Sequence, residues 1–121
     1  MYKLKMDASK NRLYITMVGF FNYEEIKKWS DETIAMTKKL KPGYAVITDI
    51  SQFKPTTPEG TKEIERVQVY FKTSGVGTGV RVVGDNVLSA LQFKRMSVIS
   101  GYDPINMATL AEAEKLLDSQ K

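Results

Sequence analysis

The sequence contains neither cysteine nor histidine among its 121 residues. Without cysteine the chain cannot form a disulfide, a thiolate nucleophile, an iron–sulfur cluster or a thiolate zinc site. Without histidine it lacks an imidazole base, which excludes a Ser-His-Asp triad and a zincin motif. These two absences remove most of the common catalytic sites, and we expect neither an enzyme nor a bound cofactor.

Long apolar runs are also missing. No segment approaches the roughly 20 apolar residues that span a bilayer, and the first residues (MYKLKM) lack the apolar stretch of a signal peptide. We therefore expect no membrane span and a cytoplasmic location. The length falls within the roughly 100–200 residues of one domain, and no repeat or long linker divides it. Residues 1–121 are interpreted as a single domain.

The net charge of +4 is unevenly distributed. Residues 1–41 carry nine Lys/Arg against five Asp/Glu, whereas residues 42–121 carry nine of each. Arg12 is the only arginine in the first segment, and Lys27-Lys28 and Lys38-Lys39 fit the solvated face of one amphipathic helix. Nucleic-acid binding usually needs a concentrated basic face with arginine forks or interleaved aromatic residues. We therefore expect no nucleic-acid partner.

The periodicity of apolar residues predicts an alternating order of strands and helices. Residues 2–7 and 12–18 alternate with period two and should form a hairpin. Shorter apolar runs predict strands over residues 44–50, 80–83 and 105–108, with helical spacing between them. The order β-β-α-β-α-β-α-β-α indicates an α/β fold. We expect a mixed, mostly parallel sheet with an N-terminal antiparallel hairpin and about four helices.

Each predicted helix begins at a residue suited to capping: Asn22, Thr57, Asp85 or Asn86, and Thr109. In the first helix Trp29 shares a face with Ile26, which places it in the core. The second helix has a core stripe of Ile64, Val67 and Phe71. The third carries Leu88, Leu91, Arg95, Val98 and Ile99.

Three features have both a functional and a structural interpretation. Gly75, Gly77 and Gly79 run from a helix into a strand, the reverse of a phosphate loop, and are interpreted as a flexible connection. Asp49 and Asp85 lie at the carboxyl ends of strands, where a magnesium or acid–base pair is conceivable, although a turn and a cap also explain them. The aromatic residues Phe21 and Tyr23 flank the first cap and suggest an exposed contact surface.

The element order and three short motifs together resemble the STAS domain of anti-sigma-factor antagonists, in particular its SpoIIAA-like branch. The motifs are Gly-Phe followed by Asn-x-x-Glu over residues 19–25, Val-Ile-Thr-Asp-Ile-Ser over 46–51, and Met-Ala-Thr-Leu-Ala-Glu-Ala-Glu-Lys-Leu-Leu over 107–117. The resemblance covers nearly the whole chain. It implies a STAS-like sandwich that acts as a non-enzymatic regulatory module and binds a protein, such as a kinase-like or anti-sigma-type regulator.

In that family a partner kinase phosphorylates a serine at the start of the second helix, within Asp-Ser-Ser-Gly. The corresponding residues here are Thr57-Pro58-Glu59-Gly60, so the glycine matches but Glu59 stands where the serine would be. The resemblance implies a docking loop that has lost its phosphoserine switch. Its residues are Asp49, Ser51, Thr56, Thr57, Glu59 and Gly60. Glu59 is either a fixed anionic substitute or an ordinary first-turn glutamate, and Thr56 and Thr57 are the remaining hydroxyls.

Two further hypotheses remain open, besides a magnesium-dependent enzyme that uses Asp49 and Asp85. One is a domain that binds a small apolar ligand or lipid, because related α/β folds open an apolar cavity and six methionines would give adaptable walls. The other is a homodimer formed through a short edge strand or the apolar rim near Phe21.

Overall fold

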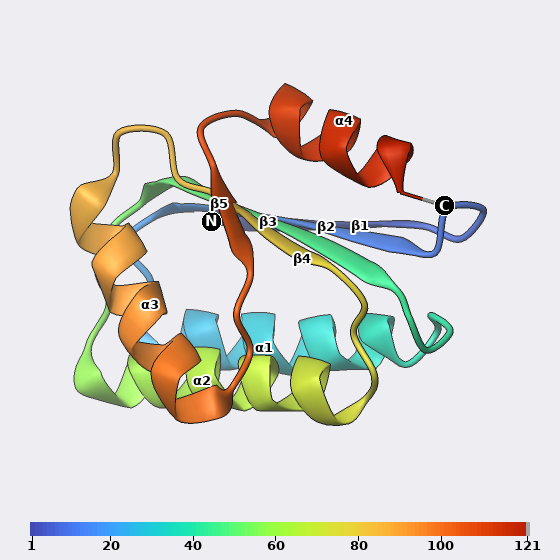
Figure 1. Ribbon diagram of the computed structural model, residues 1–121. Coiled ribbons are helices and arrows are strands. Elements are labelled where there is room, and N and C mark those ends of the chain that lie inside the picture. The colour runs from blue at the N-terminus through green and yellow to red at the C-terminus, as the bar shows by residue number, and fades with distance from the viewer. Residues whose placement is uncertain (121) are drawn as a thin grey trace.

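A computed structural model describes residues 1–120 as a five-stranded sheet with helices on both faces (Figure 1). The strands are β1 (Tyr2–Asp7), β2 (Arg12–Gly19), β3 (Ala45–Phe53), β4 (Gly79–Val82) and β5 (Ile105–Met107). The helices are α1 (Tyr23–Thr37), α2 (Pro58–Thr73), α3 (Val87–Ser100) and α4 (Leu110–Ser119). The predicted order of elements is confirmed over this part of the chain.

The strands lie in the order β1-β2-β3-β4-β5. β1 pairs antiparallel with β2, and the remaining neighbours are parallel, so the predicted mixed sheet with an N-terminal hairpin is confirmed. β3 extends to Phe53, beyond the predicted end at residue 50. In the pairing of β3 with β4, Thr48 lies directly opposite Arg81.

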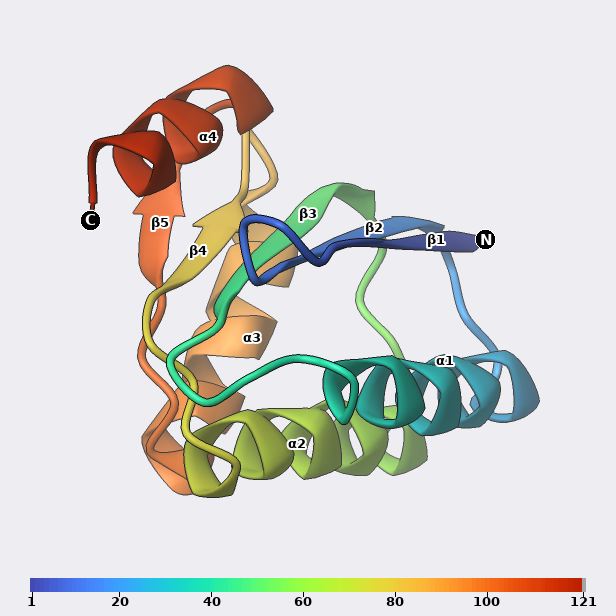
Figure 2. The same cartoon turned by 90° about the vertical axis from the view of Figure 1, so that its right-hand side faces the viewer.

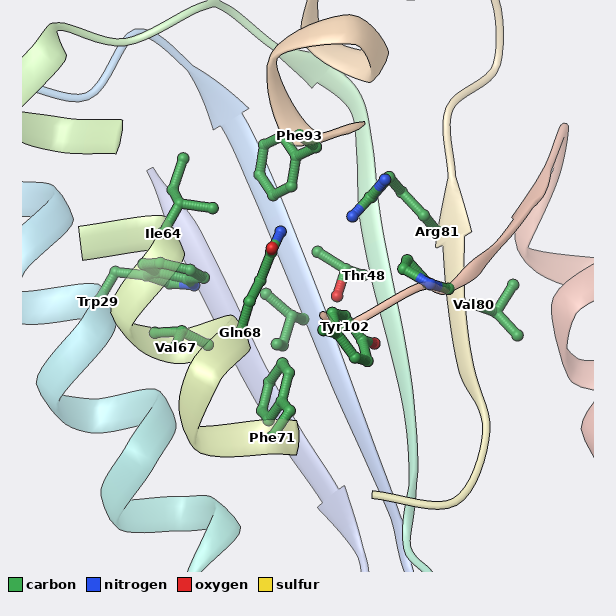
Figure 3. A pocket seen from close by; sticks show the side chains of 12 residues that line it. Trp29, Thr48, Ile64, Val67, Gln68, Phe71, Val80, Arg81, Phe93 and Tyr102 are labelled. Carbon is green, nitrogen blue, oxygen red and sulfur yellow. The ribbon is translucent and has the colours of Figure 1, made fainter. Parts of the chain in front are cut away.

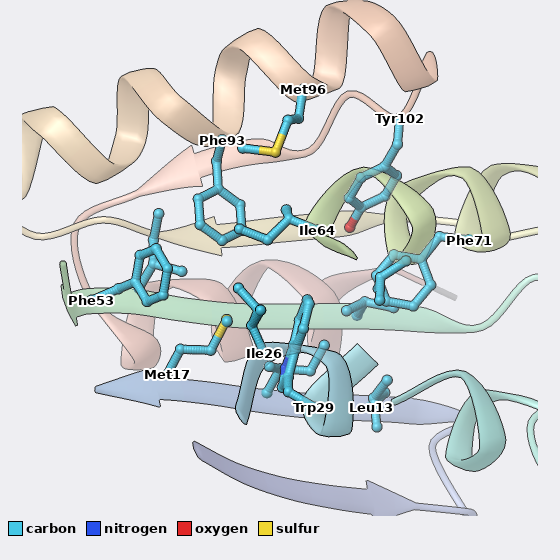
Figure 4. Close-up of a cluster of buried hydrophobic side chains, with 14 of the residues drawn as sticks. Leu13, Met17, Ile26, Trp29, Phe53, Ile64, Phe71, Phe93, Met96 and Tyr102 are labelled. Carbon is cyan, nitrogen blue, oxygen red and sulfur yellow. The ribbon is translucent and has the colours of Figure 1, made fainter. Parts of the chain in front are cut away.

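The two faces of the sheet are covered unequally. α1, α2 and α3 cover one face, and α4 alone covers part of the other (Figures 1 and 2). The larger core lies under the three helices and contains Trp29 and Phe71 (Figure 4). A smaller core under α4 contains Ile47 and Leu117. Among residues 1–120, no helix combines the length and apolar character needed to cross a membrane.

All four helices begin at a predicted cap. The backbone N–H of Glu25 donates to Asn22 Oδ1 (2.8 Å), and that of Gly60 donates to Thr57 Oγ1 (3.2 Å). The backbone N–H of Glu112 donates to Thr109 Oγ1 in the same way (3.2 Å). For α3 the cap is Asn86, not Asp85, because Asn86 Oδ1 accepts from the backbone N–H of Ser89.

The glycine-rich connection between α2 and β4 has a packing role that the sequence interpretation missed. Gly77 N donates to Tyr44 O (2.7 Å), and a Cβ at Gly77 would lie 2.5 Å from Gly43 O. A Cβ at Gly79 would overlap the Tyr102 hydroxyl. These glycines therefore allow the neighbouring backbone and the Tyr102 ring to approach closely. A merely flexible connection, as the sequence predicted, would not need glycine at these positions.

Candidate functional site

The loop between β3 and α2, residues 54–57 (the β3–α2 loop), is bound to α3 by paired hydrogen bonds. Thr56 N donates to Gln92 Oε1 (3.0 Å), and Gln92 Nε2 donates back to Thr56 O (3.1 Å). Ser89 Oγ donates to Phe53 O (2.7 Å) where the loop begins. Asn86 Nδ2 also donates to Phe53 O (2.6 Å). Two residues of α3, Ser89 and Gln92, and its cap Asn86 thus position the loop. The loop and α3 therefore form one continuous surface.

Both loop threonines have engaged hydroxyls. Thr56 is buried and its Oγ1 donates to Phe21 O (3.1 Å), whereas Thr57 Oγ1 caps α2. Gly60 packs directly on Thr56, because a Cβ at this position would overlap Thr56 Oγ1. Glu59 lies exposed in the first turn of α2. Thr56, Thr57, Glu59 and Gly60 therefore lie together at the start of α2.

Asp49 and Ser51 lie apart from that group. The Asp49 carboxylate accepts from the backbone N–H of Ser51 (3.0 Å) and from Ser51 Oγ (2.7 Å), which makes a local turn at the strand end. Asp49 follows Ile47 with the strand period of two, so it points to the face covered by α4, away from α2. Within residues 1–120, no three acidic side chains gather closely enough to hold a metal ion. The arrangement offers no support for a magnesium site.

The expected aromatic contact surface needs a correction. Phe21 is fully buried, with its ring centroid 5.5 Å from that of Phe53 and 6.2 Å from that of Tyr2. Tyr23 and the neighbouring Phe20 are exposed. Phe21 is drawn inward because the chain leaves β2 at Gly19 with a positive φ of 79° and turns toward α1.

The most unusual surface is on α3 and was not anticipated. Five large apolar residues of this helix are between 48% and 81% exposed, and we call them the α3 apolar face: Val87, Leu88, Leu91, Val98 and Ile99. The opposite side of α3 buries Ser89, Phe93, Met96 and Ser97. The sequence contained one indication of which side of α3 is buried. Ser89 and Ser97 have small polar side chains, which can lie against the sheet and form hydrogen bonds there.

The charges within α3 itself are all positive, although Asp85 is exposed just before the helix. Lys94 and Arg95 lie exposed on the same helix, which has no acidic residue, and Lys54 is exposed in the adjoining loop. Among the predicted docking-loop residues that lie in α2, Glu59 is the one with a negative charge. The surface therefore combines exposed apolar residues with basic residues, of which Lys94 and Arg95 lie between Leu91 and Val98 along the helix.

The interior between the sheet and the three helices holds little free space. The cavity there measures about 10 Å³, which is room for roughly one water molecule. We call it the interior cavity. A lipid chain does not fit in it, so the structure gives no support to the lipid-binding alternative.

Comparison with known proteins identifies the fold. No protein-family model matches the sequence, and no curated protein is significantly similar to it. The anti-sigma factor antagonist SpoIIAA in its unphosphorylated form is similar in structure, with a TM-score of 0.65 and 12% identity over 98% of this chain and 99% of that one. An uncharacterized protein of the DUF3478 family from Shewanella loihica PV-4, described as having a SpoIIAA-like fold, gives a TM-score of 0.71 and 11% identity over 96% and 93%. The chain thus has the STAS-like, SpoIIAA-like fold that the sequence resemblance implied.

Proposed function

We propose that the protein is a non-enzymatic regulatory module that binds another protein through the α3 apolar face and the β3–α2 loop. The exposed apolar residues of α3 carry this proposal, because five large apolar side chains exposed on one helix exceed the single scattered ones that need no explanation. The similarity of the fold to an anti-sigma factor antagonist supports the same functional class. A kinase-like or anti-sigma-type regulator is the partner that the STAS resemblance implies.

The charges favour a particular partner surface. Lys94 and Arg95 lie among the apolar residues of α3, and Lys54 is exposed in the adjoining loop, so the partner should present apolar residues together with acidic side chains. The 14 residues of α3 extend about 21 Å at 1.5 Å per residue. A specific interface covers roughly 800 Å² on each partner, and the β3–α2 loop, which is hydrogen-bonded to α3, enlarges the surface beyond that of the helix alone.

Glu59 gives the proposed docking surface a constant charge. It stands where the family phosphorylates a serine, and the hydroxyls of Thr56 and Thr57 are already engaged in hydrogen bonds. We infer that docking is not switched by phosphorylation of this loop. The carboxylate instead stays fixed at the positive end of α2, which also stabilises the helix.

The test compares three forms of the protein as bait for partners from the native cell. One is the wild type, one is the double variant Leu91→Glu/Val98→Glu, and the control is Val69→Glu, which alters an exposed apolar residue of α2 outside the proposed surface. We expect a specific protein to be recovered with the wild type and the control and lost with the double variant. The purified pair should then bind more weakly with rising salt and after Lys94→Glu.

Circular dichroism establishes that the variants are folded before any comparison. If no protein depends on the α3 apolar face for its recovery, the proposal is wrong. If light scattering shows a dimer of the wild type that the double variant abolishes, the occupant of the face is a second copy of this chain. An unchanged affinity after Glu59→Gln would remove Glu59 from the docking surface.

A further inference from the structure

The free edge of β1 borders a groove on the surface of α1. Side chains pack closely around the interior cavity (Figure 3), so a further binding site has to lie at the surface. β1 is an outer strand of the sheet, and α1 runs below it in Figure 2. The groove between the two has a volume of about 390 Å³, and we call it the β1–α1 groove. Its lining residues are Tyr2, Leu4, Glu32, Ala35, Met36 and Lys39.

The outer edge of β1 presents backbone groups that have no neighbouring strand. Met1 and Val18 exchange two backbone hydrogen bonds, of 2.8 and 3.0 Å. In an antiparallel ladder such pairs alternate with pairs that exchange none, so the register assigns the next bonded positions to Lys3 and Lys5. The N–H and C=O groups that point away from β2 are those of Tyr2, Leu4 and Met6. These groups are a template for one further strand.

The two faces of β1 offer different side chains to an added strand. Tyr2 and Leu4 are half-buried and pack against the larger core, as does Met36 of α1. Lys3 and Lys5 alternate with them and are exposed on the opposite face. Within residues 1–120 neither lysine forms an ion pair with a carboxylate. An added strand therefore meets a partly apolar groove on one face and two positive charges on the other.

The two lysines determine which kind of strand can bind. If two copies of β1 paired antiparallel about Leu4, Lys3 of each copy would lie opposite Lys5 of the other. Like charges directly opposite are destabilising, and lysines on an edge strand hinder the pairing of identical strands. A strand with acidic residues at these two positions forms favourable cross-strand pairs instead. The charges thus favour an acidic partner over a second copy of this chain.

We propose that the β1–α1 groove binds an extended segment of a partner protein, which adds to β1 as an antiparallel strand and alternates apolar with acidic residues. Residues directly opposite in an antiparallel pair share a face of the sheet. The apolar residues therefore lie opposite Tyr2, Leu4 and Met6, on the groove side, and the acidic residues lie opposite Lys3 and Lys5. The site goes beyond the proposed function, because α3 lies toward the opposite edge of the sheet (Figure 2).

The test uses two capped peptides that differ only in the sign of their charges, Thr-Val-Glu-Val-Glu-Val-Thr and Thr-Val-Lys-Val-Lys-Val-Thr. An NMR titration of the protein measures the binding of each. We expect the acidic peptide to bind and to slow hydrogen exchange at the amides of Tyr2, Leu4 and Met6. The amides of Lys3 and Lys5 should change less, because they are already bonded to β2. The lysine peptide should bind at least roughly 10-fold more weakly.

Reversing the charges on β1 should exchange the two peptides. We expect Lys3→Glu/Lys5→Glu to prefer the lysine peptide by roughly 10-fold. The matched control is Lys62→Glu/Lys72→Glu, which changes the net charge equally at exposed positions of α2. This control should keep the preference of the wild type for the acidic peptide.

A second variant covers the case in which the charge-reversed protein does not fold. Met6→Pro removes an outward N–H, and proline is tolerated on an edge strand at such a position. It should weaken binding of the acidic peptide by at least roughly 10-fold. The proposal is wrong if neither peptide binds, if Met6→Pro binds the acidic peptide as tightly as the wild type, or if the control loses its preference. It is also wrong if light scattering shows a dimer that Met6→Pro abolishes, since the edge would then pair with a second copy.

Discussion

The hydroxyl of Tyr102 is buried, has no hydrogen-bond partner among the described residues, and packs against the backbone of Gly79. Burial raises the pKa of Tyr102, so the phenol stays neutral. An unpaired hydroxyl contributes no hydrogen bond. We therefore expect Tyr102→Phe either to raise the free energy of unfolding or to lower it by less than about 1 kcal/mol. Gly79→Ala should instead lower it by about 1–3 kcal/mol through overpacking. Urea denaturation measures both, and equal losses in the two variants would contradict this account.

Residue-level prediction succeeded where the signal was local. Trp29 shares a helical face with Ile26, and both are buried as predicted. Phe21 was assigned to the surface because nothing in the sequence distinguishes it from Phe20 and Tyr23. Its burial depends on the register shift near Thr16 and the positive φ of Gly19, which redirect the chain at the end of β2. Such a change in the direction of the chain leaves no periodic pattern in the sequence.

Asn86 is the element-scale link between α3 and the end of β3. It caps α3, and its Nδ2 donates to Ile50 O (2.9 Å) and Phe53 O (2.6 Å). Asn86→Ala removes the cap, which costs about 1 kcal/mol of stability. It also leaves the two carbonyl groups with fewer hydrogen-bond donors, which costs about 1–3 kcal/mol more. We therefore expect urea denaturation to show a loss of about 2–4 kcal/mol. The neighbouring Asp85→Ala, at an exposed position, should stay within about 0.5 kcal/mol, and an equal loss there would mean that the cap is misassigned.

The helices differ in how far the sequence determined them. Their starts were predictable because a cap bonds to amides only three residues away. The buried side of α3 was not, because this helix has apolar residues on both sides. Its inward face is defined by Ser89, which bonds Phe53 O, and by Ser97, which accepts from Arg81. Those partners are distant in sequence, so the exposed face of α3, and with it the centre of the candidate site, was missed.

At the scale of the whole molecule, two ion pairs to one carboxylate, Asp118, join the N-terminal hairpin to the C-terminal helix. Arg12 in β2 is buried, and its Nη2 lies 2.9 Å from Asp118 Oδ1 in α4. Lys10 Nζ lies 3.3 Å from the same oxygen. α4 is the only helix on its face of the sheet within the described residues, and these contacts hold its C-terminal end against the strands. The sequence did not reveal the Arg12–Asp118 pair, because its members are 106 residues apart.

The Arg12–Asp118 pair makes a pH-dependent contribution to stability. The hydrogen bond from Arg12 lowers the pKa of Asp118 below its ordinary value of 3.8. Because the folded-state pKa is the lower one, the stabilisation is complete above the unfolded pKa and is lost as the pH falls through the folded pKa. We expect Asp118→Asn to be less stable than the wild type at pH 7, since it leaves Arg12 buried without an ion-pair partner, and the difference should narrow below about pH 4. Urea denaturation midpoints measured between pH 7 and strongly acidic pH test this. The control is Glu114→Gln on the same helix, whose difference in stability from the wild type should not narrow as the pH falls. A difference that stays constant across this range would show that Asp118 acts through packing of α4 and not through its charge.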